Sequence, residues 1–490
     1  MHPVALFRST ATAYPSPPPF HPPADFPELV RAGIRGGDVG NDVYRGVREL
    51  LTLLRLDQPR LGTADWNPLG AYIRPGDRVV IKPNLVLHEF GPQKNACCLT
   101  THGSVIRAVL DYVYLAVGPE GCITIADAPL QGADFERVSG DAGLPQIQEF
   151  YRDRLHCEIR ILDLRQLHAV IDESSSLVRR VERLPGDPQG YCEIELGKSS
   201  RLQELDALRP CYVIGDYDAA ITNVRHQHSR HSYVVSRSVL EADAVISVPK
   251  LKTHSKTGLT VCLKNAVGII GSKDCLPHHR QGKSEGDEFA PDYPARWRLS
   301  AFVHDRLQGR VPVSWWRLLR WSAQAVLGAG TPHDGRPSDF YPAGAWPGND
   351  TIWRTVEDLN RILRFYDPAR ASLQPEAQRR YFAVVDGIVA MEGNGPLRGT
   401  PKPAGVILGG DDPLAVDMVA ATLMGMKWQR IRLLQGMAGA VGHAADWENE
   451  AIALLSNAAE WNSLASLARH HLAFHPPNGW RGRVEIPHVA

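Results

Sequence analysis

The chain has few cysteines, and none of them are spaced as a metal or redox motif. Eight cysteines occur in 490 residues, and no Cys-x-x-Cys is present. The spacing therefore argues against a zinc ribbon or a bacterial ferredoxin cluster, and we expect no iron–sulfur cluster. Cysteines this sparse fit a reducing compartment better than a disulfide framework, which predicts a cytoplasmic location.

Long hydrophobic runs and an excess of one charge are also missing. No stretch approaches the ~18 continuous apolar residues of a spanning helix, and residues 1–14 lack the apolar core of a secretory signal. Lys plus Arg equals Asp plus Glu, at 54 each. A neutral chain has no overall attraction for nucleic acid, so any positive site must be local. We expect no nucleic-acid partner and no transmembrane segment.

Strand-like and helix-like segments alternate, which predicts an α/β fold built from parallel-sheet βαβ units. Apolar residues recur at helical spacing over Asn41–Leu56 and Thr101–Val117. The predicted strands are Asp77–Lys82, Gly121–Ala126, Ala244–Val248, Phe382–Val385 and Val406–Leu408. Ligands bind beyond the carboxyl ends of the strands in such sheets, so residues at these ends are site candidates.

Five regions follow from this pattern. They are a Pro-rich N-terminal arm (1–40), an α/β lobe with His and Lys motifs (41–279), a helical insertion (280–350), a second α/β part with a Gly-rich loop (351–430) and a helical C-terminal tail (431–490). The two α/β parts predict two lobes. The insertion holds Trp315, Trp316 and Trp321 among arginines. That pattern fits a helix packed on the body, a lid over the site or a weak contact with a membrane surface.

The segment Lys250–Asn265 carries the most chemistry. It follows a predicted strand and gathers positive charge in a neutral protein, on Lys250, Lys252, Lys256 and Lys264. Such a patch suits a phosphate or a carboxylate. His254 can transfer a proton near neutral pH, and Gly258 allows the backbone to approach a ligand closely. The alternative is a solvated basic loop with no ligand.

Further candidates lie at other strand ends and in polar loops. Lys82, Asn84 and Asp127 follow predicted strands, and His102 lies at a predicted helix start. A Gly-rich loop after Phe382–Val385 would bring Asp386, Glu392 and Asn394 to a ligand. A metal site is predicted from His278, His279, Asp287 and Glu288. These four residues are equally compatible with a hydrophilic loop, and His226, His228 and His231 give a weaker metal signal.

Five strings together resemble the domain-of-unknown-function family DUF362. They are Val80-Ile-Lys-Pro-Asn-Leu85, Pro249-Lys-Leu-Lys-Thr-His254, Leu263-Lys-Asn-Ala-Val-Gly268, Asp386-Gly-Ile followed by Glu392-Gly-Asn-Gly-Pro396, and Asp412-Pro-Leu-Ala-Val-Asp417. They occur in the family's order over roughly residues 75–430. The family often carries an iron–sulfur module, whose cysteines this chain lacks. The resemblance implies an α/β protein of unassigned activity.

A more distant similarity connects the chain to the nickel-pincer lactate racemases. Thr101-His102, and His254 with Gly258 and Lys264, are similar to motifs of that family. The similarity implies that His102 and His254 move a substrate proton, that Lys264 tethers a cofactor, and that a metal-ligand histidine falls near His278 or His279. This chain has Val261-Cys-Leu263 where the racemase motif has two glycines and an arginine. We therefore retain the histidine pair and leave the cofactor unassigned, with a divalent or transition metal as one candidate.

These observations predict an enzyme that uses His102 and His254 as a general acid/base pair on a small anionic carboxylate or phosphate. Racemisation, epimerisation or elimination would suit such a pair. Lys82, Lys252 and Lys264 would bind the anion together with Asn84, Gly258 and Asn265. Asp127, Asp386, Glu392 and Asn394 would orient its other groups. The alternative is a protein that binds an anionic ligand without chemistry, such as a scaffold in cell-surface polysaccharide assembly. The sequence does not fix the oligomeric state.

Overall fold

The computed structural model describes residues 1–37, 40–88, 96–171, 178–214, 219–282, 286–293, 341–441 and 451–487. Trp315, Trp316 and Trp321 of the predicted insertion lie outside the described residues, so the helical nature of that segment and its role as a lid or membrane contact stay predictions.

One ten-stranded sheet forms the centre of the described chain. Its main path runs in the order β18 (Ile452–Ser456), β1 (His2–Arg8), β17 (Arg398–Gly410), β16 (Arg380–Asn394), β10 (Ala244–Val248), β2 (Arg78–Pro83), β3 (Cys122–Asp127) and β4 (Ile159–Asp163). Strands β16, β10, β2, β3 and β4 are mutually parallel. Beyond the end of β10, β11 (Lys250–His254) pairs with β16 and with β12 (Gly258–Thr260). The predicted α/β fold with parallel strands is confirmed.

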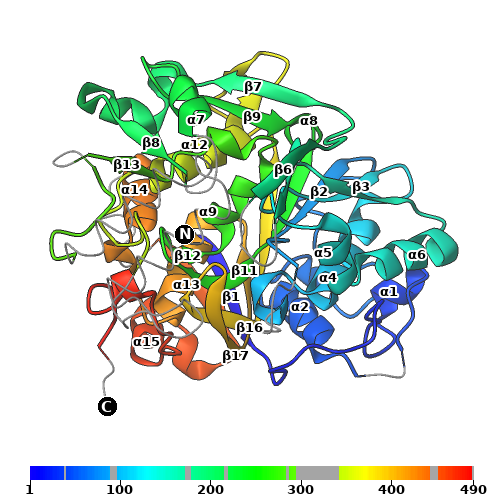
Figure 1. Ribbon diagram of the computed structural model, residues 1–490. Coiled ribbons are helices and arrows are strands. Elements are labelled where there is room, and N and C mark those ends of the chain that lie inside the picture. Colours follow the sequence, from blue (N-terminus) through cyan, green and yellow to red (C-terminus); the bar gives the residue numbers. More distant parts are fainter. Residues whose placement is uncertain are drawn as a thin grey trace.

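The sheet is buried on both faces, as parallel strands require. One hydrophobic core lies between the sheet and helices α2 (Asp42–Leu53) and α4 (Gly103–Val117), and another lies beneath α12 (Ile352–Phe365), α13 (Pro413–Leu423) and α14 (Arg432–Val441). Figure 1 shows these two groups of helices on opposite sides of the sheet. Asn41 caps α2 and Asp412 caps α13, each accepting backbone N–H groups with its side chain.

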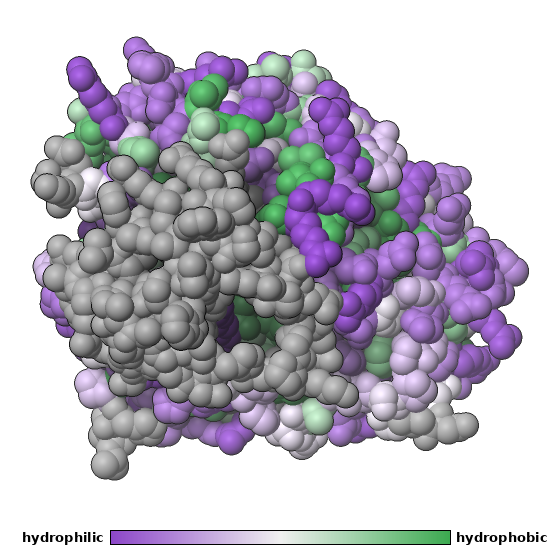
Figure 2. Space-filling model, viewed as in Figure 1, coloured by the Kyte–Doolittle hydropathy of each residue, from purple (hydrophilic) through white to green (hydrophobic). Residues whose placement is uncertain are grey.

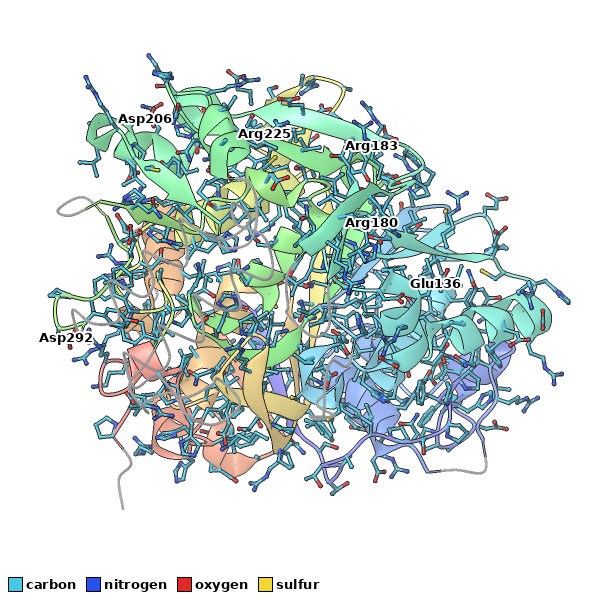
Figure 3. All side chains as sticks on the ribbon, viewed as in Figure 1. Glu136, Arg180, Arg183, Asp206, Arg225 and Asp292 are labelled. Carbon is cyan, nitrogen blue, oxygen red and sulfur yellow. The ribbon has the colours of Figure 1, made fainter. Side chains whose placement is uncertain are left out.

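Shorter elements surround this frame. The remaining helices are α1 (Pro27–Arg31), α3 (Ala96–Leu99), α5 (Phe135–Asp141), α6 (Leu144–Leu155), α7 (Ala219–Arg225), α8 (Arg237–Leu240), α9 (Cys262–Asn265) and α15 (Leu464–Arg469). Two-stranded sheets pair β13 (His279–Gln281) with β8 (Cys211–Val213), β14 (Tyr366–Asp367) with β15 (Ser372–Leu373), β5 (Leu167–Ile171) with β6 (Val178–Arg183), and β7 (Tyr191–Glu195) with β9 (Ser232–Ser236). Strand β6 presents Arg180 and Arg183 to solvent (Figure 3).

Several predicted boundaries differ from the structure. The two α/β parts are not separate lobes, because β10 of the first pairs directly with β16 of the second. The N-terminal arm begins with β1, and the C-terminal tail contributes β18, so the tail is not only helical. The Gly-rich segment after Val385 is not a loop. It continues β16 to Asn394, and the strand forms a long antiparallel hairpin with β17.

None of the helices in the described residues is both long and apolar enough to cross a membrane. On the face shown in Figure 2, hydrophilic residues predominate among the coloured atoms, and hydrophobic ones show mainly as smaller areas in the upper half.

Candidate functional site

The direction of strand order changes between β2 and β10. From β2 the chain proceeds to β3 and β4 on one side, whereas β10 and β16 lie on the other. Lys82 lies near the end of β2, Asp127 ends β3, and β11 begins just after β10. A change of this kind leaves a crevice at the carboxyl edge of the sheet, where open α/β proteins bind ligands. The topology therefore places the strand-end candidates at one location.

A cavity of about 230 Å³ occupies this location. Its described lining contains five lysines and a single carboxylate, that of Asp127. The lysines are Lys82, Lys252, Lys256, Lys264 and Lys273. When all six groups are ionised, the lining has an excess of four positive charges. Buried charge is costly unless it is paired, so this lining is suited to an anion.

Lys82 and Asp127 form a buried ion pair in one wall of the cavity. Lys82 Nζ lies 2.7 Å from Asp127 Oδ1, and both side chains are almost completely buried. Asn265 accepts from Lys82 Nζ at 3.1 Å and donates to the Lys82 carbonyl at 2.9 Å. Asp127 also accepts the backbone N–H groups of Leu85 and Ala128. These three predicted site residues are brought together, but they mainly satisfy one another.

Three other lysines of the lining have weaker partners. Lys252 and Lys273 are buried, whereas Lys264 is partly exposed. Lys252 Nζ donates to the carbonyl of Leu99 at 2.8 Å, and Lys273 Nζ donates to the carbonyl of Ala128 at 2.7 Å. The ammonium group of Lys264 makes no hydrogen bond or ion pair with any described residue. Burial lowers the pKa of Lys252 and of Lys273 to about 7, and that of Lys264 to about 8, with neighbouring ammonium groups adding to the effect.

Two neutral histidines line the same cavity in opposite tautomers. The Nδ1 of His254 accepts the backbone N–H groups of Lys256 and Thr257 at 3.1 and 3.3 Å, so its proton lies on Nε2. The Nδ1 of His278 lies 2.6 Å from the carbonyl of Leu276, so that nitrogen donates and Nε2 is left as an acceptor. Burial holds the pKa of both imidazoles well below the usual value. The cavity thus contains one imidazole donor and one imidazole acceptor.

Two neutral polar atoms in the cavity lining are also unsatisfied. Asn84 Oδ1 and Thr260 Oγ1 are buried without a hydrogen-bond partner in the described chain. Buried polar atoms are usually paired, and such exceptions call for an explanation. A polar ligand in the cavity would supply the missing partners.

His102 belongs to a second cluster and does not line this cavity. Its ring stacks on Tyr14 at 4.0 Å, its Nδ1 accepts from Ser104 N, and its backbone N–H donates to Asp386. Asp386 also accepts from Tyr14 and pairs with Lys250 at 3.0 Å. Burial lowers the pKa of His102 to about 4. His102 and His254 therefore do not line one cavity, as their predicted pairing would require. Asp386 instead connects the N-terminal arm to α4 and β11.

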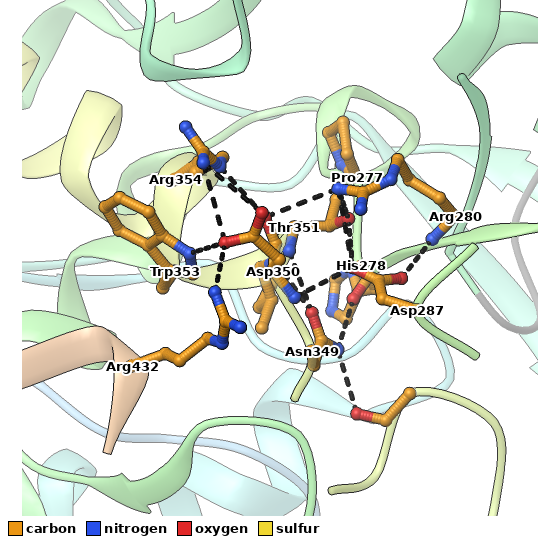
Figure 4. A network of polar contacts seen from close by, with 12 residues as sticks. Pro277, His278, Arg280, Asp287, Asn349, Asp350, Thr351, Trp353, Arg354 and Arg432 are labelled. Atoms are coloured by element: carbon orange, nitrogen blue, oxygen red, sulfur yellow. Dashed lines mark hydrogen bonds and ion pairs between the residues drawn. The ribbon is translucent and has the colours of Figure 1, made fainter. Parts of the chain in front are cut away.

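The predicted metal ligands are not gathered into one site. In the residues that the structure describes, no group of three or more His, Cys, Asp and Glu is arranged to hold a metal. Asp287 accepts from Arg280 N, Asp350 N and Thr351 Oγ1, which uses both of its oxygens (Figure 4). His279 Nδ1 lies 3.2 Å from Lys256 Nζ, while Glu288 gives its backbone carbonyl to Gly344.

The remaining candidate histidines do not form a metal site among the described side chains. The rings of His226 and His231 lie 5.9 Å apart, but His226 bonds the carbonyl of Cys275 and His231 pairs with Asp206. His228 is exposed.

Three other predicted residues hold the C-terminal segment. Glu392 pairs with Lys402 at 2.9 Å and accepts from His475 N, and Asn394 accepts from Asn478 N. Gly258 has a φ of +85°, and a Cβ there would lie 3.1 Å from the ring of Trp480. None of the three lines the cavity. Gly258 begins β12 next to the turn of the β11–β12 hairpin, and Glu392 and Asn394 lie at the end of β16, where the β16–β17 hairpin turns.

Several cavity residues are not among the predicted site residues. The sequence indicates Lys256 and Thr260 only as part of the segment Lys250–Asn265, and Lys273 is missed altogether. Lys273 lies in Gly271-Ser-Lys-Asp-Cys275, which matches no motif. The sequence indicates only that the chain returns to the sheet edge after the apolar run 259–270. It does not indicate which side chain there points into the cavity.

Comparisons with known proteins confirm the resemblance to one family. The model of the family described as "Domain of unknown function (DUF362)" matches residues 193–422. This range contains Lys252, His254, Lys264, Lys273 and His278. The chain is also 21% identical over 356 residues to the "Thylakoid-associated protein sll1697" of Synechocystis sp., an alignment covering 73% of this chain. The chain spans 65% of the length of that relative.

Proposed function

We propose that this protein is an enzyme that binds a small anionic compound at the carboxyl edge of the sheet and transfers a proton by histidine. The observation that carries the proposal is the lining of one small cavity. Five lysines there meet two neutral imidazoles, one that donates and one that accepts. The lysines bind the anionic group, and the imidazoles act on the adjacent atoms.

His278 is the proposed general base. Its Nδ1 donates to Leu276, which leaves the Nε2 lone pair as an acceptor without a partner among the described residues. Proton abstraction next to a carbonyl or carboxylate requires such an acceptor within hydrogen-bond reach. Lys256 and Lys264 hold the pKa of His278 down, after burial. A bound anion offsets those charges and raises the pKa of His278, so the substrate itself makes the base stronger.

His254 is the proposed hydrogen-bond donor to the oxygen on which negative charge develops. Two backbone N–H groups fix its tautomer, so Nε2 carries the proton in the resting state and no reorganisation is needed before it donates. As a neutral imidazole, His254 can donate this hydrogen bond while keeping its proton. Racemisation, epimerisation and elimination all pass through such a charged oxygen.

The distant motif resemblance described from the sequence agrees with this chemistry. The spacing of His254 and Lys264 is similar to motifs of the proton-transferring racemases. The geometry favours His278 over His102 as the partner of His254, because His278 shares the cavity.

The test follows hydrogen exchange, so the substrate need not be identified beforehand. A metabolite extract of the host is incubated with the protein in deuterium oxide, and mass spectrometry identifies anions that gain deuterium. We expect His278→Gln to reduce exchange by about 10²–10⁴-fold, the usual contribution of a general base. His228→Gln, at an exposed histidine, is the matched control.

Full exchange by His278→Gln would contradict the proposal. Anion binding with no exchange in any metabolite would instead favour the alternative of a ligand-binding protein without chemistry.

A further inference from the structure

We infer that the substrate carries a phosphoryl dianion held among Lys252, Lys264 and Lys273, and that its binding is coupled to proton uptake by the protein. The word substrate here rests on the proposed function, whereas the binding of the dianion stands without it.

The number of charges points to a dianion. Lys82 is matched by Asp127 at 2.7 Å, and four lysines of the described lining remain. Among these four, Lys252, Lys264 and Lys273 have no carboxylate of their own in that lining. Lys252 and Lys273 each donate to a backbone carbonyl, and Lys264 has no described partner. A monoanion would leave most of this charge uncompensated in a buried site, whereas a dianion offsets two ammonium groups at once.

The kind of cation points to a phosphoryl group. The described lining of the cavity contains lysine but no arginine. Planar carboxylates are recognised best by the planar fork of arginine, which donates two parallel hydrogen bonds. Ammonium groups are point charges that can approach from several directions. Three terminal phosphoryl oxygens offer acceptors in several directions, and His254 Nε2–H adds one more donor beside the lysines.

Proton uptake follows from the groups around the three lysines. Lys250, Cys98, Lys264 and Asp127 act on Lys252. Asp127, Lys82, Lys264 and Arg165 act on Lys273, and Lys256 and Lys82 act on Lys264. Burial and the positive neighbours together lower each pKa to about 7 or about 8. A dianion favours the charged form and raises these pKa values, so lysines that are partly neutral at pH 8 take up protons on binding.

Affinity should consequently fall as the pH rises above about 7, since the free lysines lose their protons there. Sulfate stays a dianion over that range, whereas inorganic phosphate gains its second charge near neutral pH. The pH dependence is therefore measured with sulfate, so that it reports on the protein and not on the probe.

The experiment is calorimetric titration of the full chain with inorganic phosphate, sulfate and acetate at pH 8, in buffers of different ionisation enthalpy. We expect phosphate and sulfate to bind at least tenfold more tightly than acetate, with net uptake of protons. Lys264→Met and Lys273→Met should each weaken phosphate binding at least tenfold and reduce the uptake. Lys198→Met, at an exposed lysine outside this cavity, should bind like the wild type.

Acetate binding as tight as phosphate, an absence of proton uptake, or no binding at millimolar phosphate would each overturn the inference. The proposed function fails separately. If exchange into a metabolite without phosphate depends on His278, the inference is wrong and the enzyme proposal stands. If phosphate binds with proton uptake and no metabolite exchanges hydrogen, the reverse holds.

Discussion

Replacing Lys264 by methionine should stabilise the empty protein. The ammonium group of Lys264 has no described partner, and burial with its neighbours lowers its pKa from 10.5 to about 8. In the unfolded chain the same group keeps its ordinary pKa. As the pH falls from 10.5 to about 8, the unfolded state therefore gains a proton before the folded state does, and stability is lost over that window.

The size of the effect follows from the pKa difference. One pKa unit corresponds to about 1.4 kcal/mol. A fall of the Lys264 pKa from 10.5 to about 8 therefore destabilises the folded state by roughly 3 kcal/mol at neutral pH. Methionine has a similar length and no charge, so Lys264→Met should recover part of this, about 1–3 kcal/mol. The gain should shrink as the pH rises from 8 to 10, where the wild-type lysine becomes neutral in the fold.

Chemical denaturation without phosphate at pH 7 and at pH 9.5 measures this. We expect a higher denaturation midpoint for Lys264→Met at pH 7 and a smaller difference at pH 9.5. Destabilisation of the variant by about 1 kcal/mol or more at pH 7 would refute the reasoning, because it would mean that the ammonium group has a structural partner. Lys198→Met, at an exposed lysine, should leave both midpoints unchanged.

Two further substitutions test buried ion pairs, Lys82–Asp127 in the cavity lining and Arg107–Asp111 in α4. Gly268→Ala should lower stability by about 1–3 kcal/mol and weaken phosphate binding, because an added Cβ would overlap both Asp127 and Lys82. An unchanged phosphate affinity in the same titration would show that the position of the Lys82–Asp127 pair does not matter for binding. Asp111→Asn should cost about 3–5 kcal/mol in denaturation, since it leaves the guanidinium of Arg107, itself fully buried, without its carboxylate. A loss below about 1 kcal/mol would show that Arg107 finds another partner.

Local sequence patterns predicted the frame of the fold well. The β-branched run before Lys82, the helical spacing after Thr101 and the apolar run 244–248 correspond to β2, α4 and β10. These elements are specified by nearby residues, so a single sequence reveals them. The carboxyl-edge rule then located Lys82, Asn84, Asp127 and Lys252 on one cavity.

Long-range pairing limited the rest. Strand β1 lies between β17 and β18, partners roughly 400 and 450 residues away, and nothing local marks it as part of the central sheet. The glycines between Asp386 and Pro396 suggested a loop, but cross-strand pairing with β17 holds Gly387 and Gly393 in a strand. Tertiary context overrode local preference in both cases.

The roles of single histidines were equally hard to predict. His102 and His278 have similar sequence signals, each beside a strand or helix boundary. Stacking on Tyr14 holds His102 away from the cavity, and a bond to the Leu276 carbonyl orients His278 within it. Both outcomes depend on residues whose contacts a sequence does not show.

The most direct test of the central claim compares two variants on the same exchanging substrate. If the lysines bind and His278 transfers the proton, Lys264→Met should mainly raise KM, whereas His278→Gln should mainly lower kcat. The basic limb of the pH profile of kcat/KM should move to higher pH in Lys264→Met, because Lys252 and Lys273 still titrate there and each loses a positive neighbour that lowers its pKa. Wild-type kcat and KM in both variants would contradict the account, because they would place the reaction outside the lysine-lined cavity.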